Sequence, residues 1–200
     1  MSTSVNQSLA VTAPNALPVS RSLGSDLGLA LAGSLVVAAC AQIMVPMQPV
    51  PWTGQTLGVL LVGAVLGPRL GAMAILVYLA QGAAGLPVFA GGVGGLGFLV
   101  GKTGGYLLGF IGAAYITGLL VQRGWGRSFP TRLAAMGLAS LFVFIPGVIV
   151  LSLFIGPALA FKTGFVGFIP EAIAKATLAA ALMPIGWKAM AWLSGSRPSR

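Results

Sequence analysis

The chain of 200 residues is 57% hydrophobic, holds 11 basic and 2 acidic residues, and contains no histidine. Soluble domains carry about 25% charged residues, so this chain is too poor in charge to cover its own surface against water. The composition therefore predicts an all-α integral membrane protein. With one cysteine, Cys40, and two acids, Asp26 and Glu171, no disulfide, metal cluster or catalytic dyad can be proposed, and we expect no enzymatic activity and no cofactor.

Residues 1–20 contain Ser, Thr, Asn, Gln and Pro without hydrophobic periodicity, which predicts a disordered N-terminal tail. A membrane domain is expected over 21–193, followed by a short C-terminal tail over 194–200. A membrane helix needs about 20 apolar residues, and breaks at proline, glycine clusters and charges divide the domain into six predicted spans. These are 27–45, 53–67, 70–87, 104–122, 133–157 and 170–193. The second is short, so five spans are the alternative.

The first span also imitates a lipoprotein cleavage site at Val37-Ala38-Ala39-Cys40. The apolar run continues past Cys40 to Val45, which favours a cysteine buried in a packed membrane helix. We therefore expect an uncleaved first span.

Basic residues predict the orientation, because Lys and Arg are retained on the cytoplasmic side of a membrane. Eight fall on one side of a six-span topology: Arg21, Arg69, Arg123, Arg127, Arg132, Lys188, Arg197 and Arg200. Only Lys102 and Lys162 fall in or beside the opposite loops. Both termini are thus predicted to be cytoplasmic, in a multi-pass protein of the inner cell membrane.

The strongest polar signal lies at the start of the last span, where Glu171 and Lys175 follow Pro170. Proline suits the first helical turn, and the spacing of four places both charges on one face of the helix. A charge at mid-membrane costs about 2.5–3.5 kcal/mol on insertion scales, so it normally has a partner or a function. The two residues form an intrahelical ion pair, or they present a donor and an acceptor to a ligand.

The three predicted outer connections gather hydrogen-bonding side chains, aromatic rings and glycine, which fits a small-molecule pocket. The second connection contains Gly92-Val93-Gly94-Gly95-Leu96-Gly97 and Gly101-Lys102-Thr103. Both resemble nucleotide motifs, but they lack the preceding strand, the spacing or the acidic residue that such sites need. Any ATP must therefore be hydrolysed by another chain.

Small residues recur at every fourth position in three rows: Gly63, Gly67 and Gly71; Gly101, Gly105 and Gly109; Ala30, Ser34 and Ala38. Such rows let membrane helices approach closely. Most are expected to serve internal packing, while the row on the first span could instead face a partner subunit.

Several unusual segments occur in a specific order: VPWTGQTLG at 50–58, LGPRLG at 66–71, GLPVFAGG at 85–92 and GKTGGYLLG at 101–109. Together they resemble the BioY family, the biotin-binding membrane components of energy-coupling-factor transporters. The resemblance is dense over 45–115, looser in the first and last two spans, and absent from the tails. It implies six membrane helices and an outward-facing pocket that captures biotin, beside the start of the sixth helix. It also implies an energy-coupling transmembrane subunit and ATPase subunits as partners, together with membrane lipid and without nucleic acid.

By this resemblance, Lys175 matches a family lysine that lies beside the biotin rings. The family's acid three residues earlier is replaced by Ala172, and Glu171 is displaced from it by one position. The family's arginine in the glycine-rich loop is replaced by Val93, so we expect Lys102 to supply that cation. These differences leave the polar contacts open.

Biotin offers ureido N–H donors, an acceptor oxygen, an apolar thioether ring and a carboxylate. The candidate binding residues that supply matching groups are Gln55, Phe89, Gly91, Gly92, Lys102, Tyr106, Glu171 and Lys175. Phe89 and Tyr106 could instead be interfacial aromatic residues, and Gln55 could only cap a helix. The row Ala30, Ser34 and Ala38 is the expected docking surface for the partner transmembrane subunit.

Two functions follow from this reading. The chain is the capture subunit of an ATP-driven biotin importer, or it is a solitary facilitator or secondary carrier for biotin or another small carboxylate. Uptake by cells that lack any partner would indicate the second.

Overall fold

The computed structural model describes residues 23–193, which form a helical bundle with one short β-ribbon. Helices α1, α2, α3, α5, α6 and α8 follow the six predicted spans in order. Their bounds are Leu23–Ala41, Gln55–Leu66, Pro68–Ala83, Gly104–Leu120, Phe129–Ile155 and Ile169–Leu193.

Four described segments are long and apolar enough to cross a membrane: Leu23–Ala41, Gly104–Trp125, Phe129–Ile155 and Pro157–Trp192. Helix α2 is a shorter apolar helix of 12 residues. The helical membrane character is therefore confirmed, whereas the number of crossings and the side of the termini stay predictions. The predicted tails, 1–20 and 194–200, lie outside the described residues.

The connection between α6 and α8 is not the loop that the sequence predicted. It contains helix α7 (Pro157–Gly164) and a 3-10 turn, η2 (Val166–Phe168). Gly156 ends α6 with a positive φ of 80°, which glycine adopts without a Cβ clash, and Pro157 starts α7 at once. Two other short elements are α4 (Leu96–Leu99) and a π-helical turn, η1 (Val121–Trp125).

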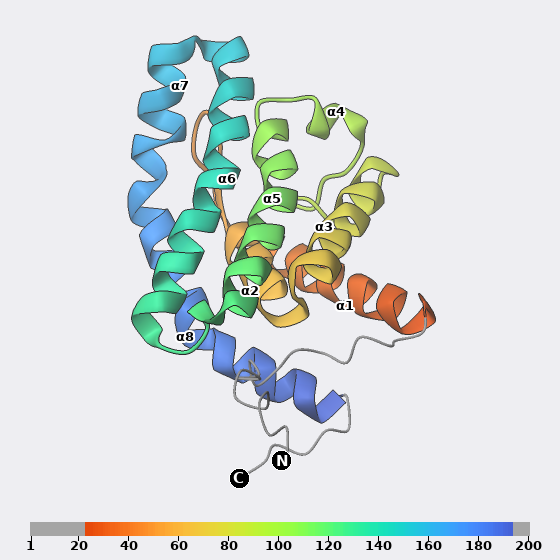
Figure 1. Cartoon of the computed structure of the whole chain (residues 1–200). Coiled ribbons are helices and arrows are strands. Elements are labelled where there is room, and N and C mark those ends of the chain that lie inside the picture. Colours follow the sequence, from red (N-terminus) through yellow and green to blue (C-terminus); the bar gives the residue numbers. More distant parts are fainter. Residues whose placement is uncertain (1–22, 194–200) are drawn as a thin grey trace, which may run out of the picture.

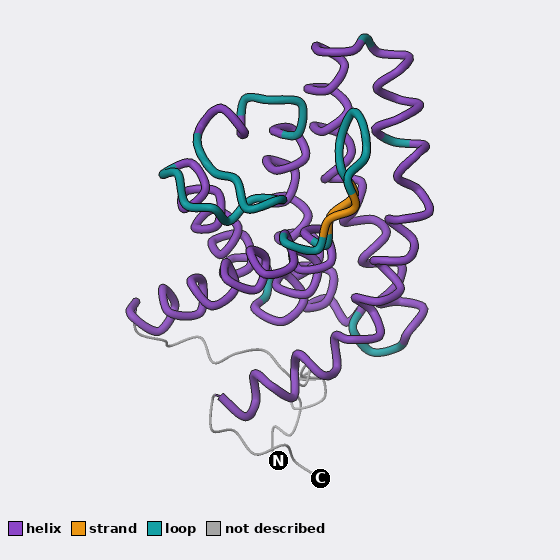
Figure 2. The backbone as a smooth tube through the Cα atoms, turned by 180° about the vertical axis from the view of Figure 1, so that it is seen from behind, coloured by secondary structure: helices purple, strands orange, loops and turns teal. Residues whose placement is uncertain are grey.

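The end of the first predicted span is also different, because α1 stops at Ala41. Strand β1 (Met44–Val45) then pairs with β2 (Trp52–Thr53) as an antiparallel ribbon, with Met44 opposite Thr53. Prolines at 46, 49 and 51 disfavour helix in this segment. Figure 2 shows this ribbon and its loop in the same upper half of the molecule as the long connection between α3 and α5.

Helices α5 and α6 stand side by side through the molecule (Figure 1), and glycine allows their close approach. A Cβ on Gly105 would overlap the carbonyl oxygen of Pro146, and one on Gly109 would overlap that of Phe142. Pro146 has no N–H to bond the Phe142 carbonyl four residues earlier, so this carbonyl is free to face α5. The glycine row of α5 therefore serves internal packing.

The row on α1 is also packed inside the bundle in this structure, and its predicted role in docking a partner subunit stays a prediction. Ala30 and Ser34 are fully buried, and Ala38 is partly buried against the core. A Cβ on the neighbouring Gly33 would lie 2.8 Å from Ala74 Cβ of α3. This face of α1 therefore packs on the rest of the bundle.

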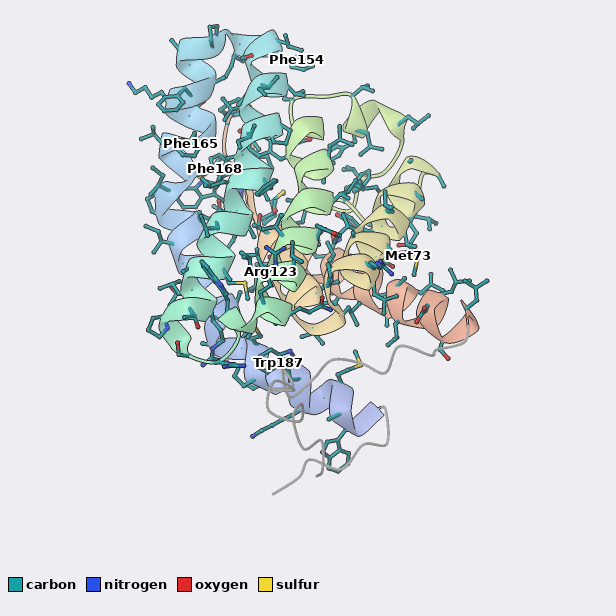
Figure 3. All side chains as sticks on the ribbon, viewed as in Figure 1. Met73, Arg123, Phe154, Phe165, Phe168 and Trp187 are labelled. Carbon is teal, nitrogen blue, oxygen red and sulfur yellow. The ribbon has the colours of Figure 1, made fainter. Side chains whose placement is uncertain are left out.

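Two carbonyl groups that prolines leave without a helical partner are bonded by side chains at the lower end of the bundle. Pro184 lies inside α8 and leaves the Ala180 carbonyl free, and Arg132 Nη1 donates to that oxygen at 3.1 Å. Pro68 likewise frees the Ala64 carbonyl at the end of α2, and Trp187 Nε1 donates to it at 3.2 Å. Figure 1 shows α8 turning beneath the bundle, and Figure 3 shows Trp187 on the turned part. The bend is thus fixed by bonds to two other helices.

We expect Gly109→Ala to destabilise the folded protein by roughly 1–3 kcal/mol, because the added methyl group meets the α6 backbone. Gly137→Ala is the matched control, since nothing lies within 4 Å of a Cβ there and alanine favours a helix by about 0.5–1 kcal/mol. Unfolding in detergent measures both effects. Equal changes in the two variants would contradict the close α5–α6 contact.

Candidate functional site

A partly open cavity lies between the end of the ribbon, the starts of α2 and α8, and the facing sides of α5 and α6. Its polar lining consists of Thr53, Gln55, Thr56, Thr103, Glu171 and Lys175. Its aromatic lining consists of Phe98, Tyr106, Phe110, Phe144 and Phe168.

The charged residues of the cavity lining lie on the first two turns of α8. Lys175 Nζ donates to Glu171 Oε1 and to the backbone carbonyl of Thr53. The side chains of Lys175 and Glu171 are only 15% and 10% exposed. Glu171 lies in the first helical turn, where the helix dipole stabilises an anion. The ion pair that the sequence offered as one alternative is therefore present, and both of its residues line the cavity.

Gln55 lies at the first position of α2 and is 5% exposed at the cavity wall. Its Nε2 lies 2.6 Å from the hydroxyl of Tyr78, and its Oε1 accepts from the Thr53 hydroxyl at 2.9 Å. Both Gln55 and Lys175 are thus held by Thr53, one through its side chain and the other through its carbonyl.

The aromatic wall is held by contacts across the bundle. The Tyr106 hydroxyl donates to Gly164 O at 2.9 Å, and its ring stacks on Phe168 at 6.0 Å between centroids. A Cβ on Gly147 would overlap the Tyr106 ring, so glycine makes room for it on α6. Phe165 and Phe168 lie beside α6 in Figure 3. The cavity lining therefore combines aromatic rings with a charged pair.

Four of the eight predicted binding residues line the cavity: Gln55, Tyr106, Glu171 and Lys175. Phe89 is fully buried in the core, edge-on to Tyr78 and stacked on Phe98 at 5.2 Å. Gly91, Gly92 and Lys102 are exposed and lie outside the lining. Ala90 and Thr103, the residues next to them in sequence, line the cavity instead. The predicted segments therefore reach the cavity, although the three predicted residues themselves do not line it.

The sequence reading missed Thr53, Phe98, Phe144 and Phe168 at the cavity, and Tyr78 behind it. Nearly every helix of this chain is apolar all round, so hydrophobic periodicity does not distinguish a cavity face from a lipid face. The clearest available signal was Phe168, because it lies three residues before Glu171 in the segment that opens the last helix.

The cavity has the groups to bind a small polar molecule with an apolar body. One cation, one carboxylate, an amide and hydroxyl groups meet aromatic rings in a partly enclosed space. No group of three or more His, Cys, Asp or Glu residues suited to a metal ion occurs within residues 23–193.

Comparisons with known proteins agree on one family. The sequence profile of the BioY family matches residues 12–192. A probable biotin transporter BioY of Pyrococcus horikoshii is 44% identical over 140 residues, which cover 70% of this chain and 82% of that protein. The biotin transporter BioY of Thermotoga maritima is 41% identical over 147 residues, which cover 72% and 85%.

A solved structure has the same fold. The crystal structure of the S-component for biotin from an ECF-type ABC transporter aligns with a TM-score of 0.71 and 24% sequence identity, over 82% of this chain and 93% of that one. The family profile spans nearly the whole described bundle, including the ribbon and the cavity. This chain belongs to the BioY family.

Proposed function

We propose that this protein captures biotin at the outer face of the cell membrane and imports it as the substrate-binding component of an ATP-driven energy-coupling-factor transporter. The observation that carries this proposal is the cavity beside Glu171 and Lys175, in a chain of the BioY family. Relatives that share more than 40% of their aligned residues are biotin transporters by name, and the protein of the similar structure is an S-component for biotin.

The chemistry of the cavity suits biotin. Lys175 and the Gln55 amide supply donors for the ureido oxygen or the carboxylate. Glu171 and the threonine hydroxyls can accept from the ureido N–H groups. The rings of Tyr106 and Phe168 face the same space and suit the apolar thioether ring.

Energised import needs partner chains. An energy-coupling transmembrane subunit and ATPase subunits are part of this proposal, because no described segment carries a complete nucleotide motif. Docking on Ala30, Ser34 and Ala38 stays a prediction from the resemblance. Since Ala30 and Ser34 are fully buried, such docking would require α1 to separate from α2 and α3.

Purified protein in detergent should bind biotin and gain thermal stability with it, since a ligand specific to the native state stabilises that state. Biotin amide, in which the carboxylate is replaced by a neutral amide, and lipoate serve as comparison ligands. In cells, capture without the partner subunits should give no sustained accumulation. Accumulation without partners would favour the solitary carrier, and absence of biotin binding would overturn both functions.

We expect Lys175→Met to lower biotin affinity roughly ten- to hundredfold. The substitution removes a charged donor from a buried site, at a cost of about 1.5–3 kcal/mol, and each tenfold change in affinity corresponds to about 1.4 kcal/mol. Lys102→Met is the matched control, because this lysine is exposed and lies outside the cavity lining. Equal losses in titrations of the two folded variants would contradict the assigned role of Lys175.

The predicted orientation can be tested by single-cysteine labelling on a Cys40→Ala background. A cysteine replacing the exposed Arg127 should react only from the cytoplasm, and one replacing the exposed Lys102 only from outside. Both side chains are exposed in this structure, so burial does not complicate the comparison. The reverse pattern would contradict cytoplasmic termini and place the cavity at the inner face.

A further inference from the structure

We propose that Tyr78, which lies outside the cavity, is a positioning residue that makes Gln55 a hydrogen-bond donor to an acceptor oxygen of the ligand. Tyr78 is fully buried in α3, and Gln55 lines the cavity from the first turn of α2. This inference rests on the proposed function, because it takes the cavity to be the ligand site.

The direction of the hydrogen bonds follows from the atoms that Tyr78 meets. Its hydroxyl oxygen lies 3.1 Å from Val88 O and 2.6 Å from Gln55 Nε2. A backbone carbonyl only accepts hydrogen bonds, so the single phenol hydrogen goes to Val88. The phenol oxygen must therefore accept from Gln55, and the nitrogen end of the Gln55 amide faces Tyr78. With the amide reversed, its oxygen would compete for the single phenol hydrogen, and the Val88 carbonyl would lose its donor.

Thr53 fixes the other end of the amide. Its hydroxyl donates to Gln55 Oε1 at 2.9 Å and accepts from the Gln55 backbone N–H at 3.4 Å. Thr53 thus engages the amide oxygen, and Tyr78 accepts one of the two hydrogens on Nε2. The second hydrogen is left for a ligand, on a side chain that is 5% exposed. A buried donor without a partner is costly, so an oxygen acceptor is favoured there.

The core holds Tyr78 in place. Its ring lies edge-on to Phe89 at 5.5 Å, and Phe89 stacks on Phe98, which lines the cavity. Val88, the acceptor of the phenol hydrogen, belongs to the connection between α3 and α4. Tyr78 thus links this outer connection to the amide that faces the ligand. Biotin carries two kinds of acceptor oxygen, the ureido carbonyl and the carboxylate, and either can meet Gln55.

Tyr78→Phe tests the inference, because it removes only the hydroxyl group. Titrations would use biotin, 2-iminobiotin, which lacks the ureido oxygen, and an analogue whose carboxylate is replaced by a methyl group. The variant should bind biotin about three- to tenfold more weakly than the wild type. For the one analogue that lacks the contacted oxygen, the two proteins should bind alike, which identifies that oxygen. Tyr115→Phe, the same change at an exposed tyrosine of α5, should alter none of the three affinities.

Equal weakening for all three ligands, or no weakening, would overturn the positioning role while leaving biotin binding intact. Failure of the wild-type protein to bind biotin would overturn the proposed function, and this inference with it. If Tyr78→Phe does not fold, Thr53→Val gives the second test, since it removes the hydroxyl that holds the Gln55 oxygen. This variant should bind biotin, and the analogue that keeps the contacted oxygen, more weakly than the wild type. Its binding of the analogue that lacks this oxygen should be unchanged.

Discussion

Lys175 joins the last helix to the ribbon between α1 and α2, and the candidate site depends on this contact. Its ammonium group binds Glu171 within α8 and the Thr53 carbonyl at the end of β2. A charge buried in this apolar bundle needs such partners. Because Thr53 also holds Gln55, the same short ribbon positions both a cation and an amide at the cavity wall. A ligand anion or carbonyl would thus meet donors that are already held in place.

Glycine and proline residues shape the bundle around this site. Glycine allows close contact between helices, and proline interrupts hydrogen bonds within a helix. Gly105 and Gly109 let α5 approach α6 at the place where Pro146 interrupts the backbone hydrogen bonds of α6. At the opposite end, side chains bond the carbonyls that Pro68 and Pro184 release. The cavity therefore lies between helices whose close contacts and bends are fixed on both sides of it. This rigidity suits a site in which a few polar groups must keep their places without a ligand.

The fold could be predicted largely from the sequence, and the site only in part. Glycine, proline and charge mark the ends of the six main helices. For α5 and α8, the predicted first and last residues agree with the structure to within two residues. Helix α7 was missed because a Gly-Pro pair reads as a break, although Gly156 and Pro157 here end one helix and start the next. Lys175 and Glu171 were found because charge is rare in this chain. Phe89 and Phe168 could not be separated in the same way, since burial in the core and exposure to a cavity leave the same apolar signal.

A structure of the protein with biotin in lipid nanodiscs tests most directly whether the cavity beside Lys175 is the biotin site. Biotin is expected between the ribbon, α5 and the start of α8. A ligand oxygen should lie about 3 Å from Lys175 Nζ or Gln55 Nε2. Biotin bound elsewhere, with Lys175 still engaged only by Glu171 and the Thr53 carbonyl, would contradict this assignment.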